Sequence, residues 1–279
     1  MLKLIYAACT MIACATGSWA QTLDRIKETG QLRLGFRTDA PPLSYLDGDG
    51  RPAGYTPVIC SQVAQGLANG LQMSDMQVTF VPVTAENRFD KIVSGEVDLH
   101  CGAATITLRR LADVGFSIPV YVDGAAAMLP KGASQNMGDL SGQKIAVRGG
   151  TTTEEALKNT LQSANIDAEV VAVEQHPQGV QSLLDGDVQA YFADQSLLLG
   201  LKASMDSNDN LNVMDRLLTI EKQGLGMARG DADFKLAVDS ILSEMYAIGL
   251  MGKIFKENMP GARQGAALEA LYLIAPIIE

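Results

Sequence analysis

Apolar and polar residues alternate in a way that predicts strands and helices in turn along the first hundred residues. Alternation with a period of two predicts strands over 31–36, 76–83 and 96–101. Apolar positions that recur every three or four residues predict helices between them, over 56–69 and 85–95. The Pro-, Gly- and Asp-rich stretch after the first strand predicts a loop. Such an order is typical of a mostly parallel sheet with helices on both faces.

The same alternation starts again near 125–132. Strands are predicted over 144–150, 168–173 and 188–194, and helices over 152–164, 177–186 and 195–204. A strand over 223–230 and a long helix over 231–258 follow. The chain is therefore predicted to hold two α/β units that cross near 127–132 and 220–228, with a last segment long enough to return to the first unit.

The beginning of the chain predicts export. Lys3 precedes an apolar run over residues 4–16, and Ser18 and Ala20 fit a small-x-small cleavage site. We therefore expect a signal peptide cleaved after Ala20. A membrane anchor is the first alternative, although the run is short for a membrane span. Lipidation of Cys14 is the second.

Charge narrows the class of partner. Without residues 1–20, which carry Lys3 and no acid, the chain has a net charge of −11. A strongly acidic surface argues against nucleic acid or an anionic membrane as partner. It does not exclude a small anionic ligand, because local arginines decide that.

Export also determines the state of the cysteines. Cys9 and Cys14 would leave with the signal peptide, so Cys60 and Cys101 remain as an even pair in an oxidising compartment. A disulfide between them would contribute on the order of 4 kcal/mol in the chain-entropy model. The alternative is two buried free thiols.

Catalytic and metal-binding patterns are missing from the sequence. It holds neither a Gly-x-Ser-x-Gly elbow nor a P-loop, and its two histidines, His100 and His176, are far apart along the chain. We therefore expect neither a His/Cys metal cluster nor a cofactor.

Several ordered motifs resemble one family. They are Gly95-Glu96-Val97-Asp98, the stretch 103–110 (AATITLRR), the stretch 116–121 (FSIPVY), the helix start in 147–157 (VRGGTTTEEAL) and the strand end in 188–200 (VQAYFADQSLLLG). Together they resemble the family 3 periplasmic solute-binding proteins, the amino-acid receptors of ABC importers. The resemblance extends over almost all of 24–260.

The resemblance implies the α/β periplasmic-binding-protein fold, with two lobes, each a mostly parallel sheet flanked by helices, and two hinge crossings. Lobe 1 would comprise 21–128 plus 222–279, and lobe 2 would comprise 129–221. The protein would be a monomer in the periplasm that closes over an amino acid and is recognised by a membrane permease.

The resemblance also implies a set of residues for the ligand's α-amino and α-carboxylate groups. Arg110, five residues after Thr105, would bind the carboxylate through its planar fork. Asp194 would accept the ammonium, and the remaining contacts would come from Ala103 (through its carbonyl), Thr105, Thr151 and Thr152. The alternatives are a surface arginine, helix capping by the two threonines, and an N-cap aspartate.

Three further residues resemble the glutamate/aspartate-binding branch. Arg37, Arg88 and His176 would surround a second carboxylate. As alternatives, each could be an ordinary residue of a loop or helix surface. The sequence departs from that branch at Leu43, Ala85, Ala103 and Ala104. Glutamate, aspartate, an amide side chain and a non-proteinogenic dicarboxylate therefore stay open.

Two other classes of function stay open at this point. Some relatives on this fold are cyclohexadienyl dehydratases, for which Glu154 and His100 would be the acids to test. A sensory module is the other class, and it would need a partner protein to pass on its signal. The sequence favours a binding protein over an enzyme.

Overall fold

The computed structural model describes residues 22–102, 104–206, 208–259, 262 and 264–277. The predicted signal peptide, its cleavage after Ala20 and the alternative lipidation of Cys14 lie outside the described residues, as does Ala103. Among the described residues, no helix has the length and apolar character needed to cross a membrane.

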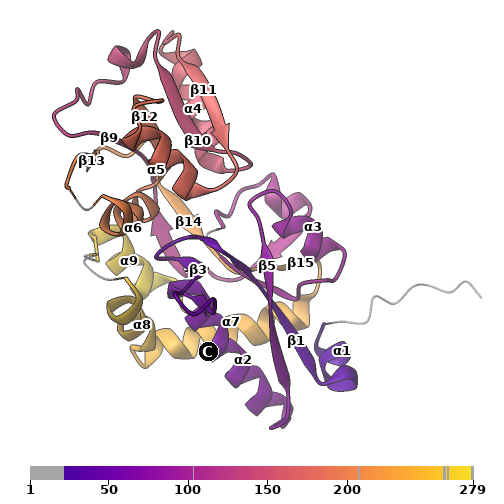
Figure 1. Ribbon diagram of the computed structural model, residues 1–279. Helices are drawn as coiled ribbons and strands as arrows, with labels where there is room; N and C mark the ends of the chain where they lie inside the picture. The colour runs from indigo at the N-terminus through magenta and orange to yellow at the C-terminus, as the bar shows by residue number, and fades with distance from the viewer. Residues whose placement is uncertain (1–21, 103, 207, 260–261, 263, 278–279) are drawn as a thin grey trace, which may run out of the picture.

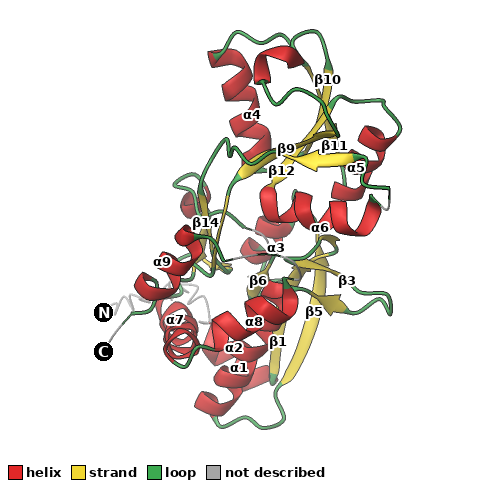
Figure 2. Ribbon diagram, turned by 90° about the vertical axis from the view of Figure 1, so that its left-hand side faces the viewer, coloured by secondary structure: helices red, strands yellow, loops and turns green. Residues whose placement is uncertain are grey.

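The first sheet has five strands. In spatial order they are β5 (Gln77–Val83), β1 (Gln31–Arg37), β6 (Leu99–Cys101), β15 (Gly226–Ala228) and β7 (Val114–Phe116). The helices packed around it are α1 (Thr22–Thr29), α2 (Tyr55–Leu71), α3 (Arg88–Val93), α7 (Ala232–Ala247) and α8 (Leu250–Asn258). Apolar residues of β1, α2, α7 and α8 form its main core, and we call this unit the first lobe (Figure 2).

The second sheet also has five strands. In spatial order they are β11 (Glu169–Val173), β10 (Lys144–Arg148), β12 (Ala190–Asp194), β9 (Ala125–Pro130) and β13 (Leu211–Val213). Its helices are α4 (Thr152–Ser163), α5 (His176–Leu184) and α6 (Gln195–Met205). Alternate residues of its strands pack against α4 on one face and against α5 and α6 on the other, so both faces are buried. This unit is the second lobe (Figure 1).

The two lobes share one strand arrangement. In each sheet the second strand in spatial order, β1 or β10, pairs in parallel with two neighbours, and the remaining two pairings are antiparallel. The predicted α/β fold with two units is confirmed, although antiparallel pairs are as frequent as parallel ones. In open α/β sheets, ligands bind outside the carboxyl ends of the parallel strands, where the strand order reverses.

Two strands between the lobes carry the connections. β8 (Tyr121–Asp123) and β14 (Glu221–Gln223) pair antiparallel between the two sheets (Figure 1). The crossing predicted near 127–132 is wrong in position. Residues 125–130 form β9, whose apolar side chains are buried inside the second sheet.

Other elements differ in detail from the sequence-based expectations. The predicted loop after β1 contains three short strands, β2 (Asp39–Ala40), β3 (Ser44–Leu46) and β4 (Pro52–Ala53). The strand expected over 223–230 is divided between β14 and β15. The helix expected over 231–258 breaks at Gly249, whose φ of 74° lies in the left-handed region that favours glycine. The remaining elements are the helix α9 (Ala266–Ile274) and the short turns η1 (Arg110–Ala112) and η2 (Met137–Leu140).

The predicted disulfide is confirmed. Cys60 of α2 is bonded to Cys101 at the end of β6. The Thr56 hydroxyl, one turn earlier on α2, donates to the carbonyl of Cys101 at 3.1 Å. The disulfide and this hydrogen bond together fix α2 against the carboxyl end of β6.

Candidate functional site

The carboxyl ends of parallel strands from both lobes meet in one cleft. Arg37 ends β1 and Arg148 ends β10. Thr105 lies shortly after β6, and Asp194 ends β12. These residues line a small cavity whose described lining residues are Arg37, Arg88, Thr105, Arg110, Arg148, Thr151, Thr152, Thr153, His176, Ala193, Asp194 and Leu197. The structure thus brings together eight of the nine predicted ligand-binding residues, and the ninth, Ala103, is outside the described residues.

At one end of the cavity, Arg110 is partly buried and Arg109 is not. The Arg110 guanidinium donates to the carbonyl of Thr105 at 2.8 Å and lies over the Phe89 ring, 5.2 Å from its centroid. Burial lowers the pKa of Arg110, against the opposing effect of Glu221. Among the described residues, no carboxylate lies within ion-pair distance of Arg110, so its charge is available to an anion.

Glu221, which the sequence interpretation missed, connects both lobes at this end. Its Oε2 accepts hydrogen bonds from the hydroxyls of Thr105, at 2.5 Å, and Thr152, at 2.7 Å. Its Oε1 accepts from Thr219 at 2.7 Å. Thr151 caps α4 by accepting from the backbone N–H of Glu154 at 3.2 Å, so the capping alternative holds for this hydroxyl. The capped helix still directs its N-terminus toward the cavity, where backbone amides attract anions.

Asp194 occupies the N-cap position of α6 without capping it. Its side chain makes no capping hydrogen bond and instead accepts from the Thr153 hydroxyl at 3.1 Å and the Gln223 amide at 2.7 Å. Burial and the nearby Glu221 carboxylate raise the pKa of Asp194 to about 6. A cation placed beside Asp194 would therefore be stabilised strongly.

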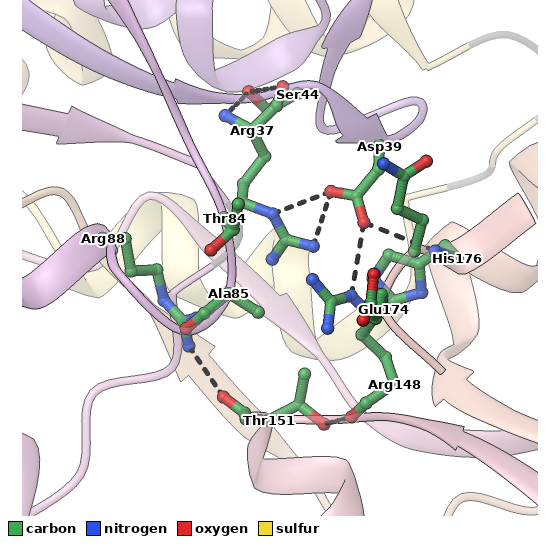
Figure 3. Close-up of polar contacts among 12 residues, drawn as sticks. Arg37, Asp39, Ser44, Thr84, Ala85, Arg88, Arg148, Thr151, Glu174 and His176 are labelled. Atoms are coloured by element: carbon green, nitrogen blue, oxygen red, sulfur yellow. Dashed lines mark hydrogen bonds and ion pairs between the residues drawn. The ribbon is translucent and has the colours of Figure 1, made fainter. Parts of the chain in front are cut away.

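At the other end, two arginines from different lobes share one carboxylate (Figure 3). Arg37 of the first lobe donates through Nε to Oδ1 of Asp39 at 2.8 Å. Arg148 of the second lobe lies 3.4 Å from Oδ2 through its own Nε and also pairs with Glu86. Burial alone would raise the pKa of Asp39, but Arg37 and the other charges around it outweigh burial, and the pKa lies below its usual value.

Arg88 is buried without such a partner. It donates to the carbonyls of Ala85 and Gly150, and its Nε has no hydrogen-bond partner among the described residues. Burial, followed by the charges of Arg110 and Arg37, lowers the pKa of Arg88 well below the usual value. Its guanidinium also lies over the Phe89 ring, 4.6 Å from the centroid.

His176 lies in the cavity wall as a neutral ring. Burial, followed by the charge of Arg37, lowers its pKa to about 3. Its Nδ1 lies 2.6 Å from the Tyr191 hydroxyl, and its backbone N–H donates to Asp39 at 3.3 Å. Any contact with a ligand would therefore be a hydrogen bond and not an ion pair.

The two acids of the enzyme alternative lie elsewhere. His100 is fully buried in the first sheet, and burial lowers its pKa. Glu154 accepts from the backbone N–H of Gly150 and pairs with Lys158 on the surface of α4. Neither residue lines the cavity, so the geometry gives these two acids no position there.

Four charged residues around the site were missed from the sequence: Asp39, Glu86, Arg148 and Glu221. Of these four, Arg148 could most readily have been predicted from the sequence. It is a charged residue that ends an apolar strand just before Gly149-Gly150, which places it at the carboxyl edge of the sheet. Nothing in the local sequence pairs it with Asp39 or Glu86, which lie 109 and 62 residues away.

A larger cavity of about 710 Å³ lies between α6, β8 and the C-terminal segment. Its described lining is largely apolar, and Asp123 is its one charged side chain. Asp123 is already bonded to the Ser196 hydroxyl. Because its described lining offers no cation, this cavity suits a zwitterionic amino acid less well than the small polar one.

Residues 32–260 match the family model of bacterial extracellular solute-binding proteins, family 3. The chain belongs to this family.

Family 3 relatives resemble the chain over most of its length. The L-glutamate/L-aspartate-binding protein of Pseudomonas aeruginosa is 30% identical over 84% of this chain and 78% of its own length. The glutamate/aspartate import solute-binding protein of Salmonella typhimurium is 28% identical over 87% of this chain and 80% of its own. These family 3 relatives are binding proteins, in agreement with the prediction that the chain is not an enzyme.

A solved structure agrees with the family 3 fold. The ancestral amino acid-binding protein AncCDT-1, described as a precursor of cyclohexadienyl dehydratase, has a TM-score of 0.75 and 27% identity, and the match covers 85% of this chain and 99% of that one. The two-lobed architecture expected from the sequence is thereby confirmed.

Proposed function

We propose that this chain captures an acidic α-amino acid, of the glutamate or aspartate kind, in the cavity between its lobes and delivers it to the permease of an ABC importer. Glutamate/aspartate binding by the curated relatives supports the ligand class. In this proposal the chain is exported with cleavage after Ala20 and works as a periplasmic monomer. Its moving units are those predicted from the sequence, 21–128 plus 222–279 and 129–221, with the first boundary moved to before β9, which lies inside the second sheet.

One observation carries the proposal: Arg88 and Arg110 stand in one cavity without a carboxylate within ion-pair distance among the described residues, and Asp194 stands with them. A buried charge without a counter-charge costs several kcal/mol. Two ligand carboxylates would offset that cost at the two guanidinium groups, and an ammonium would do so at Asp194. An acidic α-amino acid carries these three charges on one small frame.

The proposal assigns a role to each predicted residue. Arg110 binds the α-carboxylate with help from Thr105, Thr152 and the α4 N-terminus that Thr151 caps. Asp194 accepts the ammonium together with the carbonyl of Ala103. Arg88 receives the second carboxylate, and Arg37 and His176 complete the wall behind it.

A thermal-shift screen tests the proposal. The chain is refolded to remove any bound ligand and is screened against all amino acids and common dicarboxylates. A ligand at 100 times its dissociation constant should stabilise the fold by about 2.7 kcal/mol. We expect glutamate or aspartate to give the largest shift. A shift only with neutral or basic amino acids would reject the acidic ligand, and a lack of response to every amino acid would reject the receptor.

A further inference from the structure

The carboxylate of Asp39 lies among the arginines at the end of the cavity assigned to the ligand side chain. Asp39 is only 7% exposed, and Arg37 and Arg148 are each 2% exposed. Its Oδ1 lies 2.6 Å from Nη2 of Arg37 and 2.8 Å from its Nε. Figure 3 shows the Asp39 carboxylate directed between the two guanidinium groups.

Asp39 also joins the two lobes. It belongs to β2 of the first lobe, together with its partner Arg37 on β1. Its Oδ2 faces the second lobe, where it lies 3.4 Å from Nε of Arg148 and accepts from the backbone N–H of His176 at 3.3 Å. One carboxylate of the protein therefore holds the place that a ligand anion would take between Arg37 and Arg148.

The charges at this end leave room for a single further anion. The three guanidinium groups of Arg37, Arg88 and Arg148 face the two carboxylates of Asp39 and Glu86, while the His176 ring is neutral. One positive charge stays uncompensated, and it belongs to Arg88, whose Nε has no partner among the described residues. Without Asp39, two positive charges would remain uncompensated.

We propose that Asp39 is a specificity-determining residue: held between Arg37 and Arg148, it limits the ligand side chain to one negative charge and moderates the preference for a carboxylate over an amide. This inference rests on the proposed function. The physical reason is like-charge repulsion. Arg37 and Arg148, which hold Asp39, both act on the charge of Arg88, so a ligand carboxylate at Arg88 would be repelled by Asp39. An amide of the same shape carries no net charge and would not be repelled. In the partly screened interior of a cleft, one such charge changes the affinity ratio by on the order of tenfold.

The test is a calorimetric titration of L-glutamate and L-glutamine into the full chain and its Asp39→Asn variant. Asparagine keeps the shape of aspartate and removes its charge. We expect the dissociation constant of glutamine divided by that of glutamate to rise about tenfold in the variant. Arg148→Gln removes a cation from the same cluster and is expected to move this ratio in the opposite direction. It also provides a test if Asp39→Asn does not fold.

Asp98→Asn is the matched control. Asp98 is also buried and also binds two arginines, Arg33 and Arg25, but it precedes β6 and so lies at the opposite end of the sheet from the cleft. Its loss should leave the glutamine-to-glutamate ratio unchanged. An unchanged or lower glutamine-to-glutamate ratio in Asp39→Asn, or an equal rise in Asp98→Asn, would overturn the role of Asp39 and leave the proposed function standing. A folded wild-type chain that binds none of glutamate, aspartate, glutamine and asparagine would overturn the proposed function itself, and this inference with it.

Discussion

Arg109 and Arg110 are neighbours in the chain, yet their guanidinium groups lie in different surroundings. The side chain of Arg109 is 83% exposed and pairs with Glu155 at 2.9 Å. Arg110 lines the cavity and donates to the carbonyl of Thr105. Replacing each of the two arginines in turn therefore tests whether the guanidinium in the cavity, and not the exposed one, binds the ligand.

Replacement of Arg110 by alanine should weaken binding of every α-amino acid by at least about 100-fold. The reason is the loss of a bidentate, charge-assisted contact worth roughly 1.5–3 kcal/mol per hydrogen bond. Arg109→Ala is the control and should leave the dissociation constant almost unchanged. Calorimetric titration compares the two variants. Tight binding by the Arg110→Ala variant would show that the α-carboxylate does not bind at this end of the cavity.

The contact between α6 and the loop after β2 should control closure of the lobes. A Cβ added at Gly200 would lie 2.6 Å from Cδ of Pro42 and 2.9 Å from the carbonyl oxygen of Pro41, across the cleft. Gly200→Ala should therefore lower ligand affinity by about tenfold, although alanine favours the helix by about 0.5–1 kcal/mol. Gly252→Ala, in α8, is the control, because a Cβ there meets nothing within 4 Å. Equal affinities in the two variants would show that closure does not need this contact.

The pKa of Asp194 predicts how affinity depends on pH. Asp194 accepts the ligand ammonium only as a carboxylate, and its pKa is raised to about 6. Affinity should fall about tenfold between pH 7 and pH 5, while the side-chain carboxyl of glutamate stays largely ionised. The Asp194→Asn variant should bind weakly and lose this dependence. If wild-type affinity is flat across this range, the ammonium does not bind to Asp194.

Unfolding would not explain that loss of affinity. A carboxyl with a raised pKa takes up its proton more readily in the folded chain than in the unfolded chain. The contribution of Asp194 to stability therefore rises as the pH falls from above 6 to below 4. Far-ultraviolet circular dichroism at pH 5 should show the fold unchanged while the affinity falls.

Removal of the disulfide should affect stability more than binding. The bond closes a loop between positions 41 residues apart, so Cys60→Ala/Cys101→Ala should lower the free energy of unfolding by about 4 kcal/mol. Neither cysteine lines the cavity, so the dissociation constant should change little. Urea unfolding and calorimetry measure the two quantities. A large loss of affinity in a folded double variant would show that the disulfide positions the cleft.

The sequence predicted those parts of the molecule that local patterns determine. Alternation predicted β1 and β10, and expected export together with cysteine parity predicted the disulfide. Ordered motifs indicated the family, and the resemblance to it and to its glutamate/aspartate-binding branch implied the eight cavity residues. The spacing of residues carries no information on ion pairs across the cleft. Arg148, Asp39 and Glu86 meet only because two sheets direct their carboxyl edges at each other. For the same reason, the shared role of Glu221 between Thr105 and Thr152 could not be anticipated.

Short strands and helix breaks were the other misses. β14 and β15 have three residues each, too few for alternation to separate them. The break at Gly249 interrupts an apolar pattern that continues on both sides, so periodicity alone predicts one helix. The first crossing between the lobes was predicted too far along the chain, near 127–132, because an apolar strand and an apolar hinge segment have the same pattern in the sequence.

The most direct measurement of the central claim is a crystal structure of the chain grown with L-glutamate. We predict that the α-carboxylate lies within hydrogen-bonding distance of Arg110, the ammonium within that distance of Asp194 and the side-chain carboxylate at Arg88. Glutamate bound in the larger cavity beside α6, or in the small cavity with its side-chain carboxylate at Arg110, would contradict the account.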